Sequence, residues 1–208
     1  MQYLMKSNAT IGLVILAAGE SKRLGEPKQL LSFQGQTLLR RIAEVGLASC
    51  CRPIVVVLGA YSQRLRNEVD ALPIHIVYNP NWSMGMSTSI EIGIAAIEEE
   101  VNPLTAIVLA LCDQPLLDAA RIDLLVQTHQ ETQKNIVVSA YNNTWGTPAL
   151  FERIFWTELK ALTGQRGAQK IALRHPNQVE AVSFEGGIYD VDTHDDYKAL
   201  LAKTGLSR

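Results

Sequence analysis

Five short apolar runs, separated by segments with helical periodicity, constrain the fold of this 208-residue chain more than any other feature. Each run is about as long as a buried strand and is rich in Val and Ile, which favours strands covered on both faces. The runs are 11–16, 53–58, 74–78, 106–111 and 135–140. Between them, apolar residues recur every three or four positions, as at Ile90, Ile94 and Ile97, which predicts amphipathic helices. This alternation predicts an α/β fold: a single domain with a mostly parallel, doubly wound sheet.

The pattern becomes less regular in the last third of the chain. Apolar and aromatic side chains there predict, in order, a helix, a short strand and a last helix at 149–162, 179–184 and 197–201. No repeat, low-complexity tract or linker interrupts the sequence. We therefore expect an N-terminal tail over residues 1–10 and one domain over residues 11–208.

Two of the predicted helices begin near capping residues. Thr88 stands three residues before Glu91, which is the spacing of a capping box. Asp118 directly precedes the helix after the fourth predicted strand, where its carboxylate can accept hydrogen bonds from the first N–H groups. Both residues are therefore expected to mark helix starts.

Composition excludes several classes of protein. Hydrophobic residues make up 47% of the chain, which rules out intrinsic disorder. The 19 Lys and Arg against 21 Asp and Glu give a net charge of −2, which argues against a wide basic face for nucleic acid. Residues 1–10 lack the apolar core of a signal peptide, and no apolar run reaches the roughly 20 residues of a membrane span. Cys50, Cys51 and Cys112 fit neither a disulfide framework nor a zinc site, so we expect them to be buried thiols of a cytoplasmic protein. From the charge balance and the lack of a membrane span, we expect that this protein binds neither nucleic acid nor membrane.

The segment after the first predicted strand is suited to phosphate binding. Residues 16–28 combine small side chains and two glycines with the cations Lys22, Arg23 and Lys28. Small residues let backbone N–H groups approach a phosphate, and the cations neutralise its charge. The glycine spacing fits neither a P-loop nor a dinucleotide-binding fingerprint. A turn with solvated charges is the alternative interpretation.

Acidic residues form a second candidate site. Asp113 comes directly after the fourth predicted strand, and residues 185–196 contain Asp190 and Asp192 and no Lys or Arg. Ligands of parallel sheets bind beyond the carboxyl ends of the strands, so Asp113 is expected near the basic loop. Carboxylates beside such a loop suit a Mg²⁺ ion shared with substrate phosphates. The alternatives are that Asp113 caps a turn and that the acids at 195 and 196 stabilise a helix start.

The chain resembles the nucleotidyltransferases of molybdenum cofactor assembly in three motifs that lie between about residues 11 and 201. The motifs are Leu16-Ala17-Ala18-Gly19-x-Ser21-x-Arg23-x-Gly25-x-Pro27-Lys28, Cys112-Asp113-Gln114-Pro115 and Asp190-Val191-Asp192-Thr193-x-x-Asp196. The resemblance implies a Rossmann-like nucleotidyltransferase fold, and the two acidic motifs narrow it to the cytidylyltransferase branch. Ala18 and Pro27-Lys28 resemble the members that use CTP, since the guanylyltransferases usually carry Gly and Asp at positions 18 and 27.

The resemblance also implies roles for individual residues. Those that would bind the nucleotide are Leu16, Ala17, Ala18, Gly19, Ser21, Arg23, Lys28, Asn79, Gly85 and Ser89. Arg23 and Lys28 would be catalytic, because they would neutralise charge on the phosphates. Asp113 and Asp192 would hold Mg²⁺ as cofactor. Gly146 and Pro148 would line the acceptor side. Helix capping is the alternative role for Ser89.

One departure from the family pattern concerns the acceptor. Where the family usually has Gly-Asp-x-Gly-Ala-Arg, this chain has Gly164-Gln165-Arg166-Gly167-Ala168-Gln169. The missing acidic and basic side chains bear on the identity of the acceptor more than on the nucleotide.

The predicted activity is a Mg²⁺-dependent transfer of CMP from CTP to the terminal phosphate of molybdopterin, with release of pyrophosphate. CTP and the molybdenum cofactor would be its small-molecule substrates, and a molybdoenzyme would be the client protein. Three alternatives stay open: a guanylyltransferase on the same acceptor, a nucleotidyltransferase with another phosphate acceptor, and a non-catalytic carrier of the molybdenum cofactor. Gln165 and Gln169 favour the carrier, whereas Lys28, Asp113 and Asp192 favour an enzyme.

Overall fold

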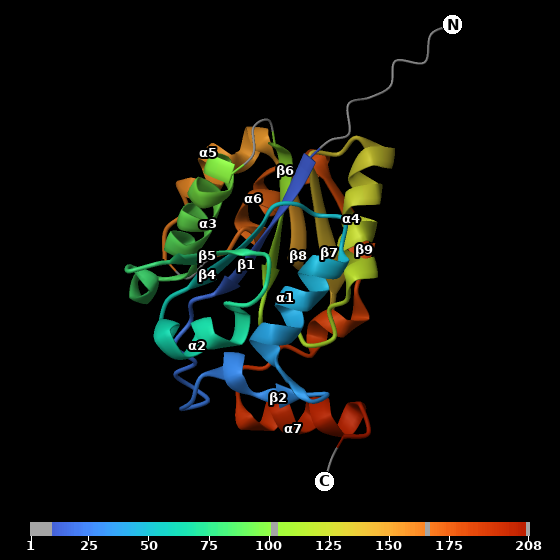
Figure 1. The fold of residues 1–208 in the computed structure, drawn as a ribbon. Helices are drawn as coiled ribbons and strands as arrows, with labels where there is room; N and C mark the ends of the chain where they lie inside the picture. The colour runs from blue at the N-terminus through green and yellow to red at the C-terminus, as the bar shows by residue number, and fades with distance from the viewer. Residues whose placement is uncertain (1–9, 101–103, 165–166, 207–208) are drawn as a thin grey trace, which may run out of the picture.

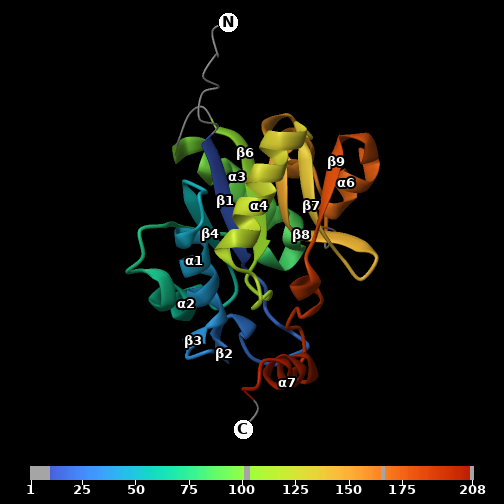
Figure 2. The same ribbon diagram turned by 90° about the vertical axis from the view of Figure 1, so that its right-hand side faces the viewer.

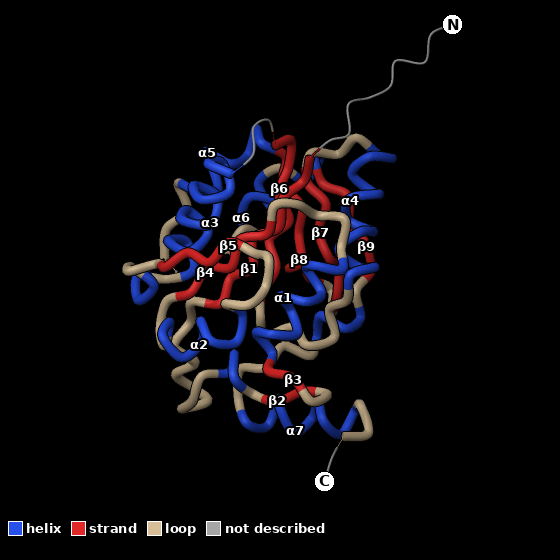
Figure 3. Tube along the Cα trace, in the orientation of Figure 1, coloured by secondary structure: helices blue, strands red, loops and turns tan. Residues whose placement is uncertain are grey.

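Seven strands form the central sheet of the chain, whose residues 10–100, 104–164 and 167–206 are described by a computed structural model. In chain order these strands are β1 (Thr10–Ala17), β4 (Ile54–Leu58), β5 (His75–Tyr78), β6 (Leu104–Leu111), β7 (Ile136–Tyr141), β8 (Thr144–Glu152) and β9 (Val179–Ser183). Their order across the sheet is β5-β4-β1-β6-β8-β7-β9 (Figure 3). Of these strands only β8 runs against its neighbours. The predicted α/β class and the mostly parallel sheet are confirmed.

Helices cover both faces of the sheet, as expected for a doubly wound fold (Figures 1 and 2). One layer contains α1 (Leu38–Ala48), α2 (Ser62–Val69) and α4 (Ala119–Thr132). The other contains α3 (Met86–Glu100), α5 (Trp156–Lys160) and α6 (Gln169–Arg174). The predicted apolar stripe of α3 is buried, because Ile90, Ile94 and Ile97 are at most 1% exposed. None of the described helices is long and apolar enough to cross a membrane.

The predicted helix over residues 149–162 is wrong. Its first part belongs to β8, and the helix α5 is confined to Trp156–Lys160. Ala149, Leu150 and Phe151 pair with β6 on one side and with β7 on the other. A continuous apolar run looks the same in a strand buried on both faces as in a buried helix, so periodicity alone could not distinguish the two.

The two predicted helix starts have different outcomes. Asp118 caps α4, where its carboxylate accepts a 2.8 Å hydrogen bond from the backbone N–H of Arg121. Thr88 does not cap a helix, because α3 already begins at Met86. The Thr88 hydroxyl instead donates to the carbonyl oxygens of Asn81 and Gly85, each at 3.0 Å. Thr88 therefore holds the loop that precedes α3.

The predictions for the first residues can be compared with the structure only in part, and those for the cysteines in full. The predicted tail over residues 1–10 lies outside the described residues except for Thr10, which begins β1. Cys51 and Cys112 are buried free thiols as expected, whereas Cys50 is exposed.

A small separate core joins two distant parts of the chain beyond the carboxyl end of β1. It lies where the short hairpin β2 (Ser32–Phe33) and β3 (Gln36–Thr37) meets the last helix, α7 (His194–Lys203) (Figures 1 and 3). Its buried members are Leu24, Leu31, Phe33, Leu38, Val191 and Leu200. This packing holds the segment around residue 192 beside the loop that follows β1.

Candidate functional site

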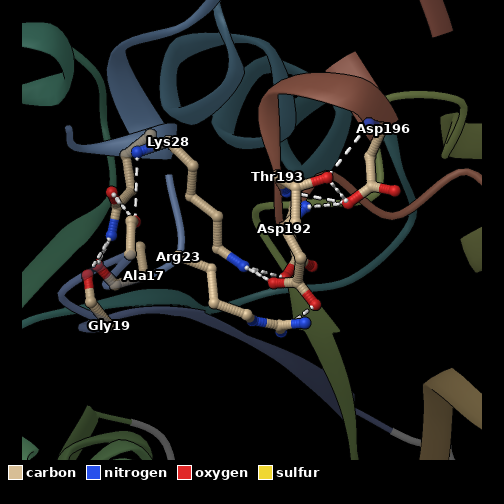
Figure 4. A network of polar contacts seen from close by, with 10 residues as sticks. Ala17, Gly19, Arg23, Lys28, Asp192, Thr193 and Asp196 are labelled. Atoms are coloured by element: carbon tan, nitrogen blue, oxygen red, sulfur yellow. Dashed lines mark hydrogen bonds and ion pairs between the residues drawn. The ribbon is translucent and has the colours of Figure 1, made fainter. Parts of the chain in front are cut away.

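The loop after β1 is held in shape by one buried amide side chain. Gln29 is completely buried, and its Nε2 donates to the carbonyl oxygens of Ala17 at 3.0 Å and Gly19 at 2.8 Å (Figure 4). Ser21 adopts a positive φ of 58°, and its hydroxyl accepts a 3.1 Å hydrogen bond from the backbone N–H of Lys28. These bonds fold the basic loop back on itself and carry Lys28 to the end of the sheet. The sequence reasoning missed Gln29, whose only signal is a polar side chain just before the apolar residues 30 and 31.

Lys28 links the two predicted metal ligands. Its ammonium nitrogen Nζ lies 2.5 Å from Oδ2 of Asp113 and 2.9 Å from Oδ1 of Asp192. Arg23 reaches the other oxygen of Asp192, with Nη2 2.5 Å from Oδ2 (Figure 4). The side chains of Lys28 and Asp113 are both only 13% exposed, whereas that of Arg23 is 68% exposed. The fold therefore brings together two cations and two carboxylates from three separate parts of the chain.

The charges of this cluster stabilise one another. Burial alone would lower the pKa of Lys28, but the negative charge of Asp113 and hydrogen bonds to Asp113 and Asp192 raise it above its ordinary value. Burial raises the pKa of Asp192. The hydrogen bonds and positive charges of Lys28 and Arg23 lower it by more, so the pKa of Asp192 lies below its ordinary value. Lys28 and Asp192 are therefore both charged at neutral pH.

The start of α7 fixes the backbone at Asp192. Asp196 accepts hydrogen bonds from the backbone N–H groups of Asp192 at 3.1 Å and Thr193 at 2.7 Å, and the Thr193 hydroxyl accepts one from the Asp196 N–H (Figure 4). This reciprocal pair is a capping box. Asp196 thus has the helix-start role that was its alternative interpretation, and it orients the neighbouring Asp192.

Two adjoining cavities lie at this end of the sheet. The first, of about 290 Å³, is lined by the loop after β1, by the segment before α3 and by Asp113. The second, of about 270 Å³, shares Leu16, Met86 and Leu111 with the first and extends between β7, β8 and α6. The described residues that line it carry no charged side chain. Ligand sites commonly measure about 300–1,000 Å³, so the two cavities together have the size of such a site.

Most of the predicted nucleotide-binding residues line the first cavity. They are Leu16, Ala17, Ala18, Gly19, Ser21, Lys28, Gly85 and Ser89. Gly85 has a φ of 118°, a backbone conformation that side chains other than glycine rarely adopt. Arg23 and Asp192 do not line the cavity; Asp192 joins Arg23 to Lys28, which does. Contact with a nucleotide stays a prediction for all of them.

Two further predicted site residues, Asn79 and Pro148, line neither cavity. Asn79 is completely buried, and its amide donates to the hydroxyls of Thr88 and Ser89 and accepts from the N–H of Asn81. Its hydrogen bonds are thus used inside the protein, to order the loop before α3. Gly146 lines the second cavity, whereas Pro148 does not, and the Pro148 carbonyl accepts a 2.7 Å hydrogen bond from the buried Ser139 hydroxyl.

The acids of the cluster fit a divalent metal ion. Oδ1 of Asp113 is buried and has no hydrogen-bond partner among the described residues, which is costly for a carboxylate unless a ligand binds it. No group of three or more His, Cys, Asp or Glu that could hold a metal occurs among those residues. Mg²⁺ is commonly held by one or two carboxylates together with water and substrate phosphates, so Asp113 and Asp192 are a sufficient protein contribution.

The lowered pKa of Asp192 predicts how stability depends on pH. Because folding favours the ionised carboxylate, the ion pairs stabilise the folded state above the ordinary pKa of about 3.9, and this stabilisation is lost as the pH falls through the lowered pKa. We expect the unfolding free energy of the wild type to fall more steeply below about pH 4 than that of Asp192→Asn. Urea denaturation at several pH values measures both slopes, and equal slopes would contradict the prediction.

The basic loop and the acidic pair lie where open α/β sheets bind their ligands, beyond the carboxyl ends of parallel strands. Residues 13–179 match the MobA-like NTP transferase domain, and the chain belongs to this family of nucleotidyltransferases. The family resemblance expected from the three motifs is thereby confirmed.

Several relatives align over nearly the whole chain. Nicotine blue oxidoreductase of Paenarthrobacter nicotinovorans is 32% identical over 200 residues, which cover 90% of this chain and 95% of that protein. Molybdenum cofactor cytidylyltransferase of Escherichia coli K12 is 25% identical over 193 residues, covering 91% and 94%.

Solved structures extend the comparison to three dimensions. The crystal structure of Rv0371c from Mycobacterium tuberculosis H37Rv superposes with a TM-score of 0.80 and 31% identity, covering 94% of this chain and 100% of that one. A crystal structure of the same protein in complex with manganese has a TM-score of 0.77 and 29% identity, covering 93% and 99%.

Proposed function

We propose that this protein is a Mg²⁺-dependent cytidylyltransferase that transfers CMP from CTP to the terminal phosphate of molybdopterin and releases pyrophosphate. The observation that carries the proposal is the cluster of Lys28, Asp113 and Asp192 beside the first cavity. The reaction would take place in the cytoplasm and would serve a molybdoenzyme as client. The name of the Escherichia coli relative supports the molybdenum cofactor as acceptor. The manganese complex of Rv0371c supports a divalent metal ion.

The chemistry of the acceptor explains why the site needs no general base. The second pKa of a phosphate monoester is about 6, so at neutral pH the acceptor is largely a dianion and is already nucleophilic. Catalysis then consists of positioning and of charge neutralisation. The backbone of the loop after β1 would hold the triphosphate, and Lys28 and Arg23 would offset the charge that develops on the departing pyrophosphate. A divalent ion held by Asp113 and Asp192 supplies further neutralisation on phosphate oxygens.

A pyrophosphate-release assay tests the proposed reaction. The purified protein is incubated with Mg²⁺, molybdopterin and each of the four nucleoside triphosphates in turn, and reactions without acceptor measure hydrolysis. Release that requires both CTP and molybdopterin is the expected result. Release with another phosphate monoester but not with molybdopterin would assign a different acceptor. Tight binding of molybdopterin without release would favour the carrier.

CTP is expected to be preferred to GTP. The loop after β1 contributes backbone and the small side chains of Ala17 and Ala18 to the first cavity, which Trp82 and Met86 also line. A pyrimidine takes up less of this space of about 290 Å³ than a purine does, which favours CTP. Competition between the two nucleotides gives the ratio of their kcat/KM values. A ratio of one or below would replace the proposal with a guanylyltransferase.

An oxidoreductase is the second candidate function. It is favoured by the name of the relative that is 32% identical and by the position of Lys28, which already neutralises the two acids without a metal. A nicotinamide dinucleotide shares ribose and phosphate groups with a nucleoside triphosphate and could use the same cavity. Tight binding of reduced nicotinamide dinucleotide without metal, measured by its fluorescence, together with no pyrophosphate release, would support this candidate over the transferase.

A further inference from the structure

Tyr141 stands where the acceptor side of the site meets the surface. It is the last residue of β7, is half-buried, and lines both the second cavity and an open groove of about 710 Å³ next to it. The groove lies between the turn that joins β7 to β8 and the segment after β9. Tyr141 is therefore one of three described residues, with Thr144 and Trp145, that line both the second cavity and the groove open to solvent.

Two glycines leave the space that the Tyr141 ring occupies. A Cβ atom on Gly146 would lie 2.0 Å from the Tyr141 hydroxyl oxygen, and one on Gly187 would lie 2.5 Å from the ring carbon Cδ1. Both distances are far below van der Waals contact, so side chains at these positions would displace the ring. Phe184 packs against the ring edge to face, with 6.3 Å between ring centroids. The ring is thus fixed from three sides, and Gly146 acts on the cavity through Tyr141.

The hydroxyl of Tyr141 is a protonated donor at neutral pH. Burial raises the pKa of Tyr141, the negative charges of Asp190 and Asp113 raise it further, and together they outweigh hydrogen bonds with the side chains of Gln114 and Thr147, which lower it. The described lining of the second cavity is uncharged, and its other side-chain donors are the hydroxyls of Thr144 and Thr147, the indole of Trp145 and the amide of Gln169, which already donates to the Thr144 hydroxyl at 2.8 Å. A neutral donor near Asp113 suits an anionic oxygen better than a second carboxylate would.

We propose that Tyr141 binds the acceptor substrate, with its hydroxyl donating a hydrogen bond to an oxygen of the acceptor phosphate at the junction of the second cavity and Asp113. The identity of the acceptor, molybdopterin, rests on the proposed function. In this proposal the role of Gly146 is to make room for the Tyr141 ring. It does not itself contact the acceptor.

The test compares Tyr141→Phe with the wild type. Loss of one hydrogen bond to a charged group weakens binding about tenfold. Tyr141→Phe should therefore raise the Kd for molybdopterin about tenfold, as measured by isothermal titration calorimetry. The acceptor KM should rise alike, whereas the nucleotide KM and the Tm should stay unchanged, because the ring still fills its place. Tyr78→Phe is the matched control, since Tyr78 is 55% exposed on the edge strand β5 and lines none of these cavities.

A double-mutant cycle tests the link to Gly146. Gly146→Ala should weaken molybdopterin binding in the wild type, and should weaken it less in the Tyr141→Phe background, where the atom nearest to the new Cβ is absent. Equal molybdopterin affinity of the wild type and Tyr141→Phe, or no binding to either, would overturn the proposal. Binding that depends on Tyr141 without pyrophosphate release from any nucleotide would leave the inference standing and reject the proposed transferase reaction.

Discussion

Replacing Lys28 with alanine is expected to lower kcat/KM for nucleotide transfer about a hundredfold, because a preorganised charge at a phosphoryl site contributes on this scale. The same change should destabilise the protein. Lys28 is paired with Asp113 and Asp192 at 2.5 and 2.9 Å. Without its ammonium group the two carboxylates would lie close together, and the cation still paired with them in the described part of the chain would be the exposed Arg23. Removing one partner of a buried ion pair costs on the order of 3 kcal/mol.

Steady-state kinetics and thermal unfolding measure the two effects of Lys28→Ala. Mg²⁺ should raise the Tm of the variant more than that of the wild type, because a metal ion can take the place of the lost cation between the acids. Lys198→Ala is the matched control: its side chain is 76% exposed, its ion pair with Asp195 is 3.2 Å long and it lines neither cavity, so both readouts should stay near wild type. A folded Lys28→Ala protein with normal turnover and normal Tm would remove Lys28 from the site.

The parts of the fold that follow from local sequence could be predicted. Runs such as 11–16 and 106–111 are continuous apolar segments of strand length, and they became β1 and β6 at the centre of the sheet. The direction of β8 could not be predicted, because antiparallel pairing with both β6 and β7 depends on contacts between distant segments. Its apolar core at 149–151 carries no period that separates strand from helix.

For the charged cluster, the sequence indicated the residues but not the contacts between them. Sequence motifs selected Lys28, Asp113 and Asp192, and topology explains why two of them meet, since Lys28 and Asp113 follow the adjacent parallel strands β1 and β6. Asp192 arrives through the small core beneath α7, whose members are scattered over the sequence. No local pattern shows that Lys28 lies between the two acids, nor that the amide of Asn79 is used up by the hydroxyls of Thr88 and Ser89.

Asp113→Asn and Asp192→Asn should each abolish most turnover and shift the Mg²⁺ dependence of the remaining activity to higher concentrations. Two carboxylates that face each other with no cation between them repel, so neutralising one of them would stabilise the metal-free protein. The position of Lys28 reverses that sign, because each substitution removes a carboxylate from a cation that is only 13% exposed. Both variants should therefore have a lower Tm without metal, and Asp113→Asn should lose more, since the side chain of Asp192 is 29% exposed.

Metal titration of turnover and thermal unfolding separate a metal ligand from a structural acid. A carboxylate that only pairs with Lys28 would alter the Tm of the metal-free protein and leave the Mg²⁺ concentration for half-maximal rate unchanged. A ligand would alter both, because the orphaned Oδ1 of Asp113 becomes an amide group that binds Mg²⁺ weakly in either orientation. Asp195→Asn is the control on the same segment, with a side chain that is 92% exposed and, among the described residues, paired with Lys198 alone at 3.2 Å. If Asp113→Asn and Asp192→Asn both keep the Mg²⁺ dependence of Asp195→Asn, the metal is held elsewhere, and the pair serves to fix the Lys28 ammonium at the end of the sheet.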